Sequence, residues 1–285
     1  MPQVNEPVAI TAIYGQPREG MHSHVFVGAN FVMQGMLNAH RDELSVAAQP
    51  SELSEAAART RAYLETEAAR VSIRGLEQGD GKVGFEVLAE NLGGHKLPTA
   101  YPARRAWLHV TVYDRDGKGV FESGALNKDG SIVGNDNDAD SRRFEPHYRE
   151  ITRSDEVEIY ESILKDAQGR VTTGLLSAVE YYKDNRLLPA GFDKTTASNH
   201  VKPVGDAMED PGFTGKGSVV QFAVRTNAAA GPFAIEVQLM YQPIVFRWAH
   251  NLGAYDAAEP KRFVGYFDEA ANSSAVVLAT ARVVQ

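Results

Sequence analysis

Two histidines near the start of the chain carry side chains that could bind a metal ion or a haem iron. His22 and His24 form a His-x-His pair. In an extended segment, side chains two residues apart lie on the same face, so both imidazoles would face one ligand. Imidazole nitrogen binds iron and zinc well. No further ligand follows at a fixed spacing, and the pair taken alone is more typical of exposed polar residues in a loop.

An acidic segment in the middle of the chain offers the hard oxygen atoms that Ca²⁺ prefers. It opens with the spacing of an EF-hand loop, but position six is Ser141 instead of glycine and position twelve is His147 instead of glutamate. A different kind of Ca²⁺ loop is one hypothesis, and a solvated acidic turn or an Asx-turn is the alternative. The candidate Ca²⁺ ligands, which include two residues from a later polar cluster, are Asp136, Asp138, Asp140, Asp184 and Asn185.

Three other histidines leave an enzymatic interpretation open. His95, His147 and His200 are scattered along the chain, so only folding could bring them together with nearby acids. Such a group would support a metal-assisted oxidoreductase or hydrolase. The sequence contains no phosphate-binding G-x-x-x-x-G-K-[ST] loop, no G-x-S-x-G elbow and no H-E-x-x-H helix. Spacing alone therefore identifies no catalytic constellation.

Composition narrows the classes of function. The chain has 285 residues, with 29 Lys and Arg against 37 Asp and Glu, which gives a net charge of −8 and disfavours nucleic-acid binding. Because there is no cysteine, the chain itself cannot form a disulfide, a thiolate zinc site or a C-x-x-C-H attachment for haem c. No apolar run approaches the roughly 20 residues of a transmembrane helix. The first residues lack the basic and apolar regions of a signal peptide, which fits a cytoplasmic protein, a mature product or an excised domain.

The elements that must position these residues change in type along the chain. An extended lead-in is expected over residues 1–25, followed by a helix within 28–44 and a second helix from Pro50 with Ser51 as its N-cap. Beyond residue 71 the two-residue alternation of strands recurs in short segments, and short helices are expected again near Pro243 and after Pro260. The strand-like segments are 83–88, 107–113, 120–121, 156–163, 219–224, 233–241 and 275–284.

This order of elements predicts a mainly β protein. Many short strands with turn residues between them, and no regular alternation with helices, are typical of an antiparallel β-sandwich, Ig-like in kind. We expect an N-terminal helical arm and short late helices to accompany it. Residues 1–70 would form the lead-in and helical arm, and residues 71–285 the sandwich domain with long loops.

A series of short motifs runs through most of the chain in a definite order. In sequence they are Met21-His22-Ser23-His24, Asn91-x-x-Gly94-His95-Lys96-Leu97-Pro98-Thr99, Arg104-Arg105-Ala106-Trp107, Phe121-Glu122-Ser123-Gly124, Pro146-His147-Tyr148, Ile159-Tyr160-Glu161, Asp184-Asn185-Arg186-Leu187-Leu188-Pro189 and Tyr241-Gln242-Pro243. This series resembles the C-terminal, haem-free half of bacterial multihaem c-type cytochromes, over about residues 20–250. Ala100 departs from the glycine of the Pro-Thr-Gly-Tyr-Pro form of the second motif.

The resemblance implies a non-catalytic supporting or docking module of a periplasmic or extracellular electron-transfer system. In that family the half follows a run of C-x-x-C-H sites, so haem c would lie in an upstream region or a partner subunit. Histidines outside those sites often complete haem ligation there, which makes His22 and His24 candidate axial ligands. Ca²⁺ would then hold the loops of the sandwich. The alternatives are a Ca²⁺-stabilised sandwich that binds a carbohydrate, a peptide or a partner subunit, and the metal-assisted enzyme.

Overall fold

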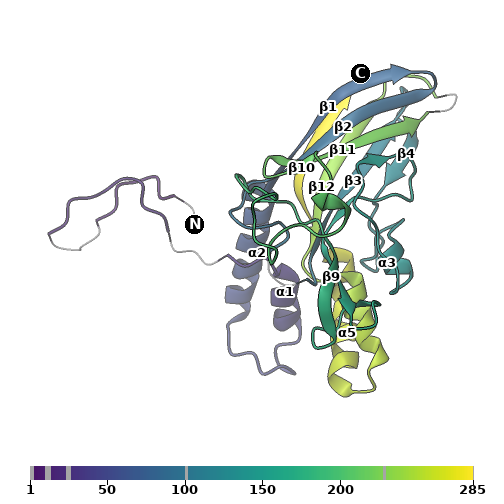
Figure 1. The fold of residues 1–285 in the computed structure, drawn as a ribbon. Helices are drawn as coiled ribbons and strands as arrows, with labels where there is room; N and C mark the ends of the chain where they lie inside the picture. Colours follow the sequence, from purple (N-terminus) through teal and green to yellow (C-terminus); the bar gives the residue numbers. More distant parts are fainter. Residues whose placement is uncertain (1–2, 10–13, 24–26, 100–101, 227–228, 285) are drawn as a thin grey trace.

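The computed structural model describes residues 3–9, 14–23, 27–99, 102–226 and 229–284. Two larger β-sheets and a small third sheet form most of the body, and an extended segment projects from it (Figure 1). The prediction of a mainly β protein with antiparallel sheets is confirmed, and the open sheets are consistent with a sandwich. Within the described residues, no helix is both long and apolar enough to span a bilayer.

Helices α1, α2 and α5 lie at the end of the body opposite the C-terminus (Figure 1). Gln49, not Ser51, is the N-cap of α2, and the Glu52 carboxylate accepts a hydrogen bond from the Gln49 N–H at 2.7 Å. The predicted cap was wrong because Pro50, whose φ suits the first helical position, is already part of the helix. The helical elements are α1 Phe31–Ala39, α2 Pro50–Glu67, α3 Asp136–Ala139, η1 Asp206–Met208, α4 Phe246–His250, η2 Asn251–Ala254, α5 Ala258–Ala270 and η3 Ala271–Ser273.

The first sheet has the strand order β1–β2–β11–β10, all antiparallel, with β5 added in parallel beside β11. Its central pairing joins distant parts of the chain, because Phe85 of β2 lies opposite Phe222 of β11. The strands of this sheet are β1 Ala69–Gly79, β2 Lys82–Asn91, β5 Glu150–Ile151, β10 Phe213–Thr214 and β11 Gly217–Arg225.

The second sheet has the order β13–β12–β3–β4, with β6 beside β3. Leu108 of β3 lies opposite Leu239 of β12. The strands of this sheet are β3 Arg105–Tyr113, β4 Gly119–Ser123, β6 Ile159–Tyr160, β12 Ala234–Gln242 and β13 Val276–Val284. The third sheet has the order β8–β7–β9. It is made of β7 Ser162–Asp166, β8 Val171–Thr172 and β9 Ala178–Asp184.

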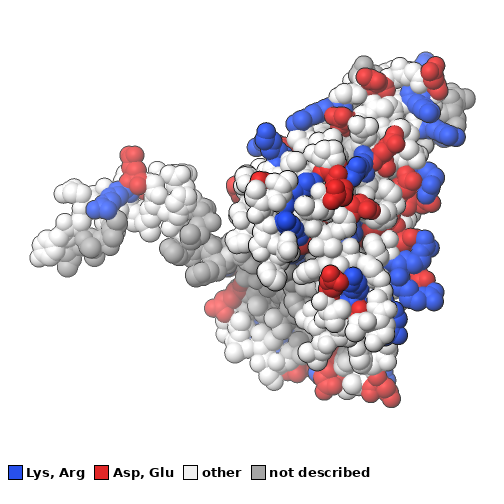
Figure 2. Space-filling view, viewed as in Figure 1, with Lys and Arg blue, Asp and Glu red and all other residues white. Residues whose placement is uncertain are grey.

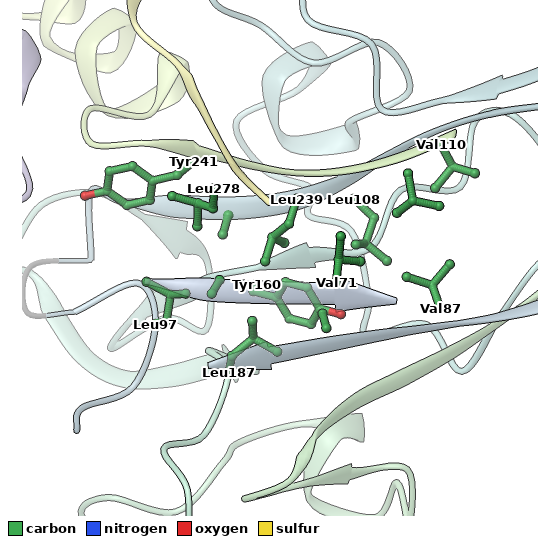
Figure 3. Packing of buried hydrophobic residues seen from close by; sticks show 14 of the residues in the cluster. Val71, Val87, Leu97, Leu108, Val110, Tyr160, Leu187, Leu239, Tyr241 and Leu278 are labelled. Carbon is green, nitrogen blue, oxygen red and sulfur yellow. The ribbon is translucent and has the colours of Figure 1, made fainter. Parts of the chain in front are cut away.

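The hydrophobic core lies between the two larger sheets. Figure 3 shows side chains from both meeting there, among them Val71 and Val87 of the first sheet and Leu108, Val110 and Leu239 of the second. Alternate residues of β3 point into this core, as its two-residue periodicity predicts. The other face of β3 is also covered near the start of the strand, so the residues there can form buried polar contacts.

The extended segment, which we call the arm, comprises the described residues 3–9 and 14–23. Its chain folds back on itself through isolated bridges between Gln3 and His22 and between Val8 and Arg18. It extends away from the body (Figure 1). In Figure 2 most of the arm is uncharged, whereas Lys and Arg are interspersed with Asp and Glu over the visible face of the body.

Candidate functional site

Strand β3 begins with a buried arginine that holds several segments together. The Arg105 side chain is 0% exposed, and its Nη1 donates to both carboxylate oxygens of Asp138 at 2.9 Å. Its Nε donates to Gln242 Oε1 at 2.9 Å and its Nη2 to Gly130 O at 3.0 Å. Gln242 Nε2 also donates to Ser274 Oγ at 2.8 Å. We call these five residues the Arg105 cluster.

A second buried group contains a histidine that lies between two carboxylates. His147 Nδ1 is 2.7 Å from Glu158 Oε1, and its Nε2 is 3.0 Å from Asp210 Oδ2. Because an ionised carboxylate can only accept, this geometry favours an imidazole that is protonated on both ring nitrogens. Asn185 Nδ2 donates to the same Glu158 oxygen at 2.9 Å. We call His147, Glu158, Asp210 and Asn185 the His147 cluster.

The electrostatics of His147 follow from this geometry. Burial alone would lower the pKa of the ring, since it penalises the charged form. The charge of Glu158 and the hydrogen bonds from Glu158 and Asp210 outweigh burial and raise the pKa of His147 above its usual value. The ring is 1% exposed. The protonated form is therefore the one that this site stabilises.

A second ion pair extends the His147 cluster. Lys183 Nζ lies 3.2 Å from Glu161 Oε1 and donates to Ile159 O at 2.7 Å. The backbone N–H of Glu161 in turn donates to Asn185 Oδ1 at 3.0 Å. Burial raises the pKa of the Glu161 carboxyl, although the positive charges of Lys183 and Arg105 oppose this shift.

A third ion pair anchors the loop after β2 to the end of β9. Lys96 Nζ is 2.7 Å from Asp184 Oδ2, and Arg186 donates to both Asp184 oxygens at 2.7 Å. Burial would raise the pKa of Asp184, but the hydrogen bonds and charges of Arg186 and Lys96 lower it overall. We use the name buried polar network for the Arg105 cluster, the His147 cluster and these two ion-paired groups.

A backbone contact from a tryptophan lies beside the network. Trp107 Nε1 donates to Gly124 O at 2.8 Å. Gly124 has a φ of 79°, and a Cβ there would clash with Leu108 O. Only glycine fits this close approach without displacing β3.

The buried polar network connects segments of the chain. Its charged groups are paired, and most of them are buried, where unpaired charges are costly. Its members come from β3, α3, β9, β12 and the loops between these elements. The arrangement is suited to fixing loops on a sandwich, and its histidine has no free nitrogen to act as a base or a metal ligand.

The residues predicted to bind Ca²⁺ lie in several different environments. Each of the four carboxylates has a cationic partner: Asp136 with Arg143, Asp138 with Arg105, Asp140 with Arg142, and Asp184 with Lys96 and Arg186. Asn185 belongs to the His147 cluster. Among the described residues there is no group of three or more His, Cys, Asp or Glu side chains that could hold a metal. The Ca²⁺ site stays a prediction from the sequence alone.

The other candidate histidines lie in different segments of the chain. His22 lies in the arm and is exposed, and His24 falls outside the described residues. His95 is exposed in the loop after β2, His147 is enclosed in its cluster, and His200 is exposed in the long loop before η1. Of the three histidines considered for an enzyme, two are thus exposed in loops and one is enclosed.

Two hollows lie near the arm end of the body. The larger is a groove of about 1400 Å³ bordered by the β8–β9 loop and by α4, η2 and α5, with Trp248 and Phe263 among its lining residues. The smaller, which we call the junction pocket, has a volume of about 330 Å³. It lies between residues 27–29, α2, the loop after β2 and the end of β12, and His95 and Arg104 contribute to its lining. Arg104 also borders the larger groove.

Sequence reasoning missed several members of the network. Glu158, Asp210 and Gln242 were not singled out as partners, because an ion pair between residues far apart in sequence leaves no local pattern. Asp138 is 33 positions from Arg105, and Asp210 is 63 from His147. The sequence does place charged residues at the ends of apolar strands. A charge that is buried there needs a partner, so this pattern indicates that ion pairs form in the interior.

Comparisons with known proteins give one match. No family model matches the chain, and no curated protein matches it. A solved structure described as a penta-heme cytochrome c552 from Thermochromatium tepidum is similar at 15% identity and a TM-score of 0.45, covering 79% of this chain and 41% of that one. The chain thus spans about two fifths of the length of that cytochrome.

Proposed function

We propose that this chain is a non-catalytic supporting and docking module of a multihaem c-type cytochrome electron-transfer system that works outside the cytoplasm. The observation that carries the proposal is that motifs far apart in the sequence lie together in one buried group of side chains. Motif residues separated by more than a hundred positions, such as Arg105 and Gln242, meet in the buried polar network. They are the same residues through which the sequence resembles the haem-free half of such cytochromes.

The roles of these residues favour a scaffold over an active site. The motif residues Glu161 and His147 are paired and enclosed, so their contacts help to build the sandwich. Catalysis requires a reactive group that a substrate can reach. The accessible features that remain are the arm, the larger groove and the junction pocket, and these are suited to contact with another protein region.

Haem c would be carried by that other region, because this chain has no cysteine to attach it. The arm presents His22 at an exposed position. An imidazole on an extended segment has the reach to approach an iron held outside the body. His22 and His24 are therefore the proposed axial ligands from the arm, and the sandwich would hold the arm in place.

The test is an absorption spectrum of the protein captured from its native source with its bound partners. A Soret band and sharp reduced α and β bands are expected from c-type haem in the captured assembly. Capture through His22→Ala and His24→Ala variants then shows whether the haem spectrum changes. A colourless assembly that contains partners without haem would contradict the proposal and favour a binding module of another kind.

A further inference from the structure

The larger groove is an apolar surface that the described part of the chain leaves uncovered. Leu175 and Leu176 of the β8–β9 loop and Tyr255 after η2 line it, and all three side chains are exposed. Its volume of about 1400 Å³ is above the range of roughly 300–1,000 Å³ that is typical of small-molecule sites. The groove therefore has the size to receive a segment of polypeptide.

The charge of the groove is opposite to that of the whole chain. Arg104, Arg142 and Arg170 line it, whereas Asp166 is the one carboxylate among its described lining residues. The chain as a whole has a net charge of −8. Arg142 and Arg170 each pair with an aspartate but remain mostly exposed, so part of each guanidinium is accessible. A complementary segment would combine apolar side chains with carboxylates.

The arm has side chains of both kinds. Tyr14 and Met21 are exposed apolar residues, and Tyr14 is 94% exposed. Glu6 and Glu19 are also exposed, and neither makes an ion pair with a described residue. These two carboxylates outnumber the one arginine of the arm, Arg18. The arm therefore matches the groove in both apolar character and charge.

The backbone of the arm is also suited to a further partner. Its two legs are joined by hydrogen bonds from the Val4 N–H to Met21 O at 2.8 Å and from the Val8 N–H to Arg18 O at 3.0 Å. An isolated two-stranded hairpin is marginally stable in water. Strand β8 lines the groove and, among the described residues, pairs only with β7. Its outer edge is therefore available to an extended segment through main-chain hydrogen bonds.

We propose that the arm of one copy of the chain docks in the larger groove of a second copy, which returns the same contact. Such an exchange is two-fold symmetric and uses one pair of surfaces twice. A second copy is the occupant because the arm extends away from its own body, where its exposed side chains are placed to meet another molecule (Figure 1). This inference goes beyond the proposed function and does not depend on a haem.

The experiment is sedimentation velocity of the purified full chain over a range of concentrations. We expect mostly monomer at about 1 µM and mostly dimer at about 100 µM, which corresponds to a dissociation constant on the order of 10 µM and to a contact of modest size. At the lower concentration the arm adds little to the stability of the fold, because few copies are paired.

Two substitutions test the two sides of the contact. Leu176→Ser changes the groove and Tyr14→Ser changes the arm, and both variants should fold because these side chains are almost fully exposed. We expect each substitution to weaken the dimer by at least about tenfold. The matched control is Leu92→Ser, because Leu92 is also an exposed leucine but lies outside the groove. This variant should form the dimer as wild type does.

A mixture of the two variants distinguishes an exchange from other modes of pairing. The intact arm of the Leu176→Ser chain can dock in the intact groove of the Tyr14→Ser chain, while both substitutions fall together in the other contact. The mixture should therefore contain more dimer than either variant alone.

Four results would overturn the exchange. The first is a wild-type chain that stays monomeric over the whole range, which includes closure of the arm on its own groove. The others are a dimer that neither variant weakens, an equal loss in Leu92→Ser, and a mixture without additional dimer. Each of these leaves the proposed function standing, because that function is tested separately by the haem spectrum of the native assembly.

Discussion

The buried polar network and the arm treat polar residues in opposite ways. In the network, Arg105 and His147 are withdrawn from water and satisfied by fixed partners. In the arm, His22 is exposed, and the isolated backbone bridges of the arm's described residues lie within the arm. The comparison indicates that a charged motif residue in this chain can belong either to the buried side chains that stabilise the fold or to a contact surface. The burial of the residue distinguishes the two cases.

The largest effect on this contrast is expected when Arg105, the central arginine of the network, is replaced. Arg105→Leu leaves Asp138 buried without its cation, so we expect a loss of about 3–5 kcal/mol in the free energy of unfolding. Urea denaturation measures the change. The matched control is Arg142→Leu, which breaks an ion pair with Asp140 whose arginine is 84% exposed and should cost at most about 1 kcal/mol. Equal losses in the two variants would mean that burial does not separate them.

The next largest loss of stability is expected at Gly124, whose carbonyl makes the backbone contact beside the network. Gly124→Ala places a Cβ against Leu108 O at a residue with positive φ, so we expect a loss of roughly 2–4 kcal/mol. The control is Gly119→Ala in β4, where a Cβ meets nothing within 4 Å and φ is not positive, with an expected change within about 0.5 kcal/mol. Thermal melts of both variants check the difference. A Gly124→Ala protein as stable as wild type would show that β3 shifts freely.

A rise in pH is expected to lower stability less than these substitutions, because deprotonation of His147 removes a charge but leaves the side chain in place. The pKa of His147 is raised in the folded state by Glu158 and Asp210 against the effect of burial. Its contribution to stability is therefore complete below the unfolded-state pKa of about 6.5 and is lost as pH rises through the folded-state pKa. The urea concentration at the midpoint of unfolding should therefore fall as the pH is raised above neutral. The pKa of the His147 ring, measured by NMR titration, should lie above about 6.5. A ring that titrates below that value would contradict the charged geometry.

The smallest change in stability is expected from removal of the arm. A chain lacking residues 1–23 should unfold within about 0.5 kcal/mol of wild type, since the backbone hydrogen bonds of the arm's described residues are internal to it. The same truncation should reduce capture of the haem-bearing partner if the proposed function is right. Parallel melts and captures of the two proteins measure both. A strongly destabilised truncation would show that the arm supports the body, and the contrast with the network would fail.

The sequence predicted the elements better than the contacts between them. The alternation of β3 was identified because a sandwich strand buries every second residue, and Leu108 and Val110 do face the core. Strand β1 (Ala69–Gly79) was missed, since its charged positions Arg70 and Arg74 lie among the apolar ones and weaken the alternation. Local periodicity thus finds a strand when one face is consistently apolar.

The candidate site was harder to predict for a physical reason. Asp138 was interpreted as a Ca²⁺ ligand because a row of acids suits a hard cation, yet in the fold its partner is Arg105. The choice between a metal and an arginine depends on which cation the tertiary structure brings near the carboxylate. His147 poses the same problem, because a histidine in a polar motif has the same sequence signature whether it is exposed or held between two acids.

The sheet topology bears on how the chain is made. Strand β2 pairs with β11, and β3 pairs with β12, so each larger sheet joins an early strand to a late one. At typical translation rates, about 5–20 residues per second, β2 and β3 emerge from the ribosome on the order of ten seconds before their partners. During that time their apolar faces and open edges have no native cover. We therefore expect the yield of folded protein in a cell to depend on chaperone protection of the nascent chain as well as on the stability of the finished sandwich.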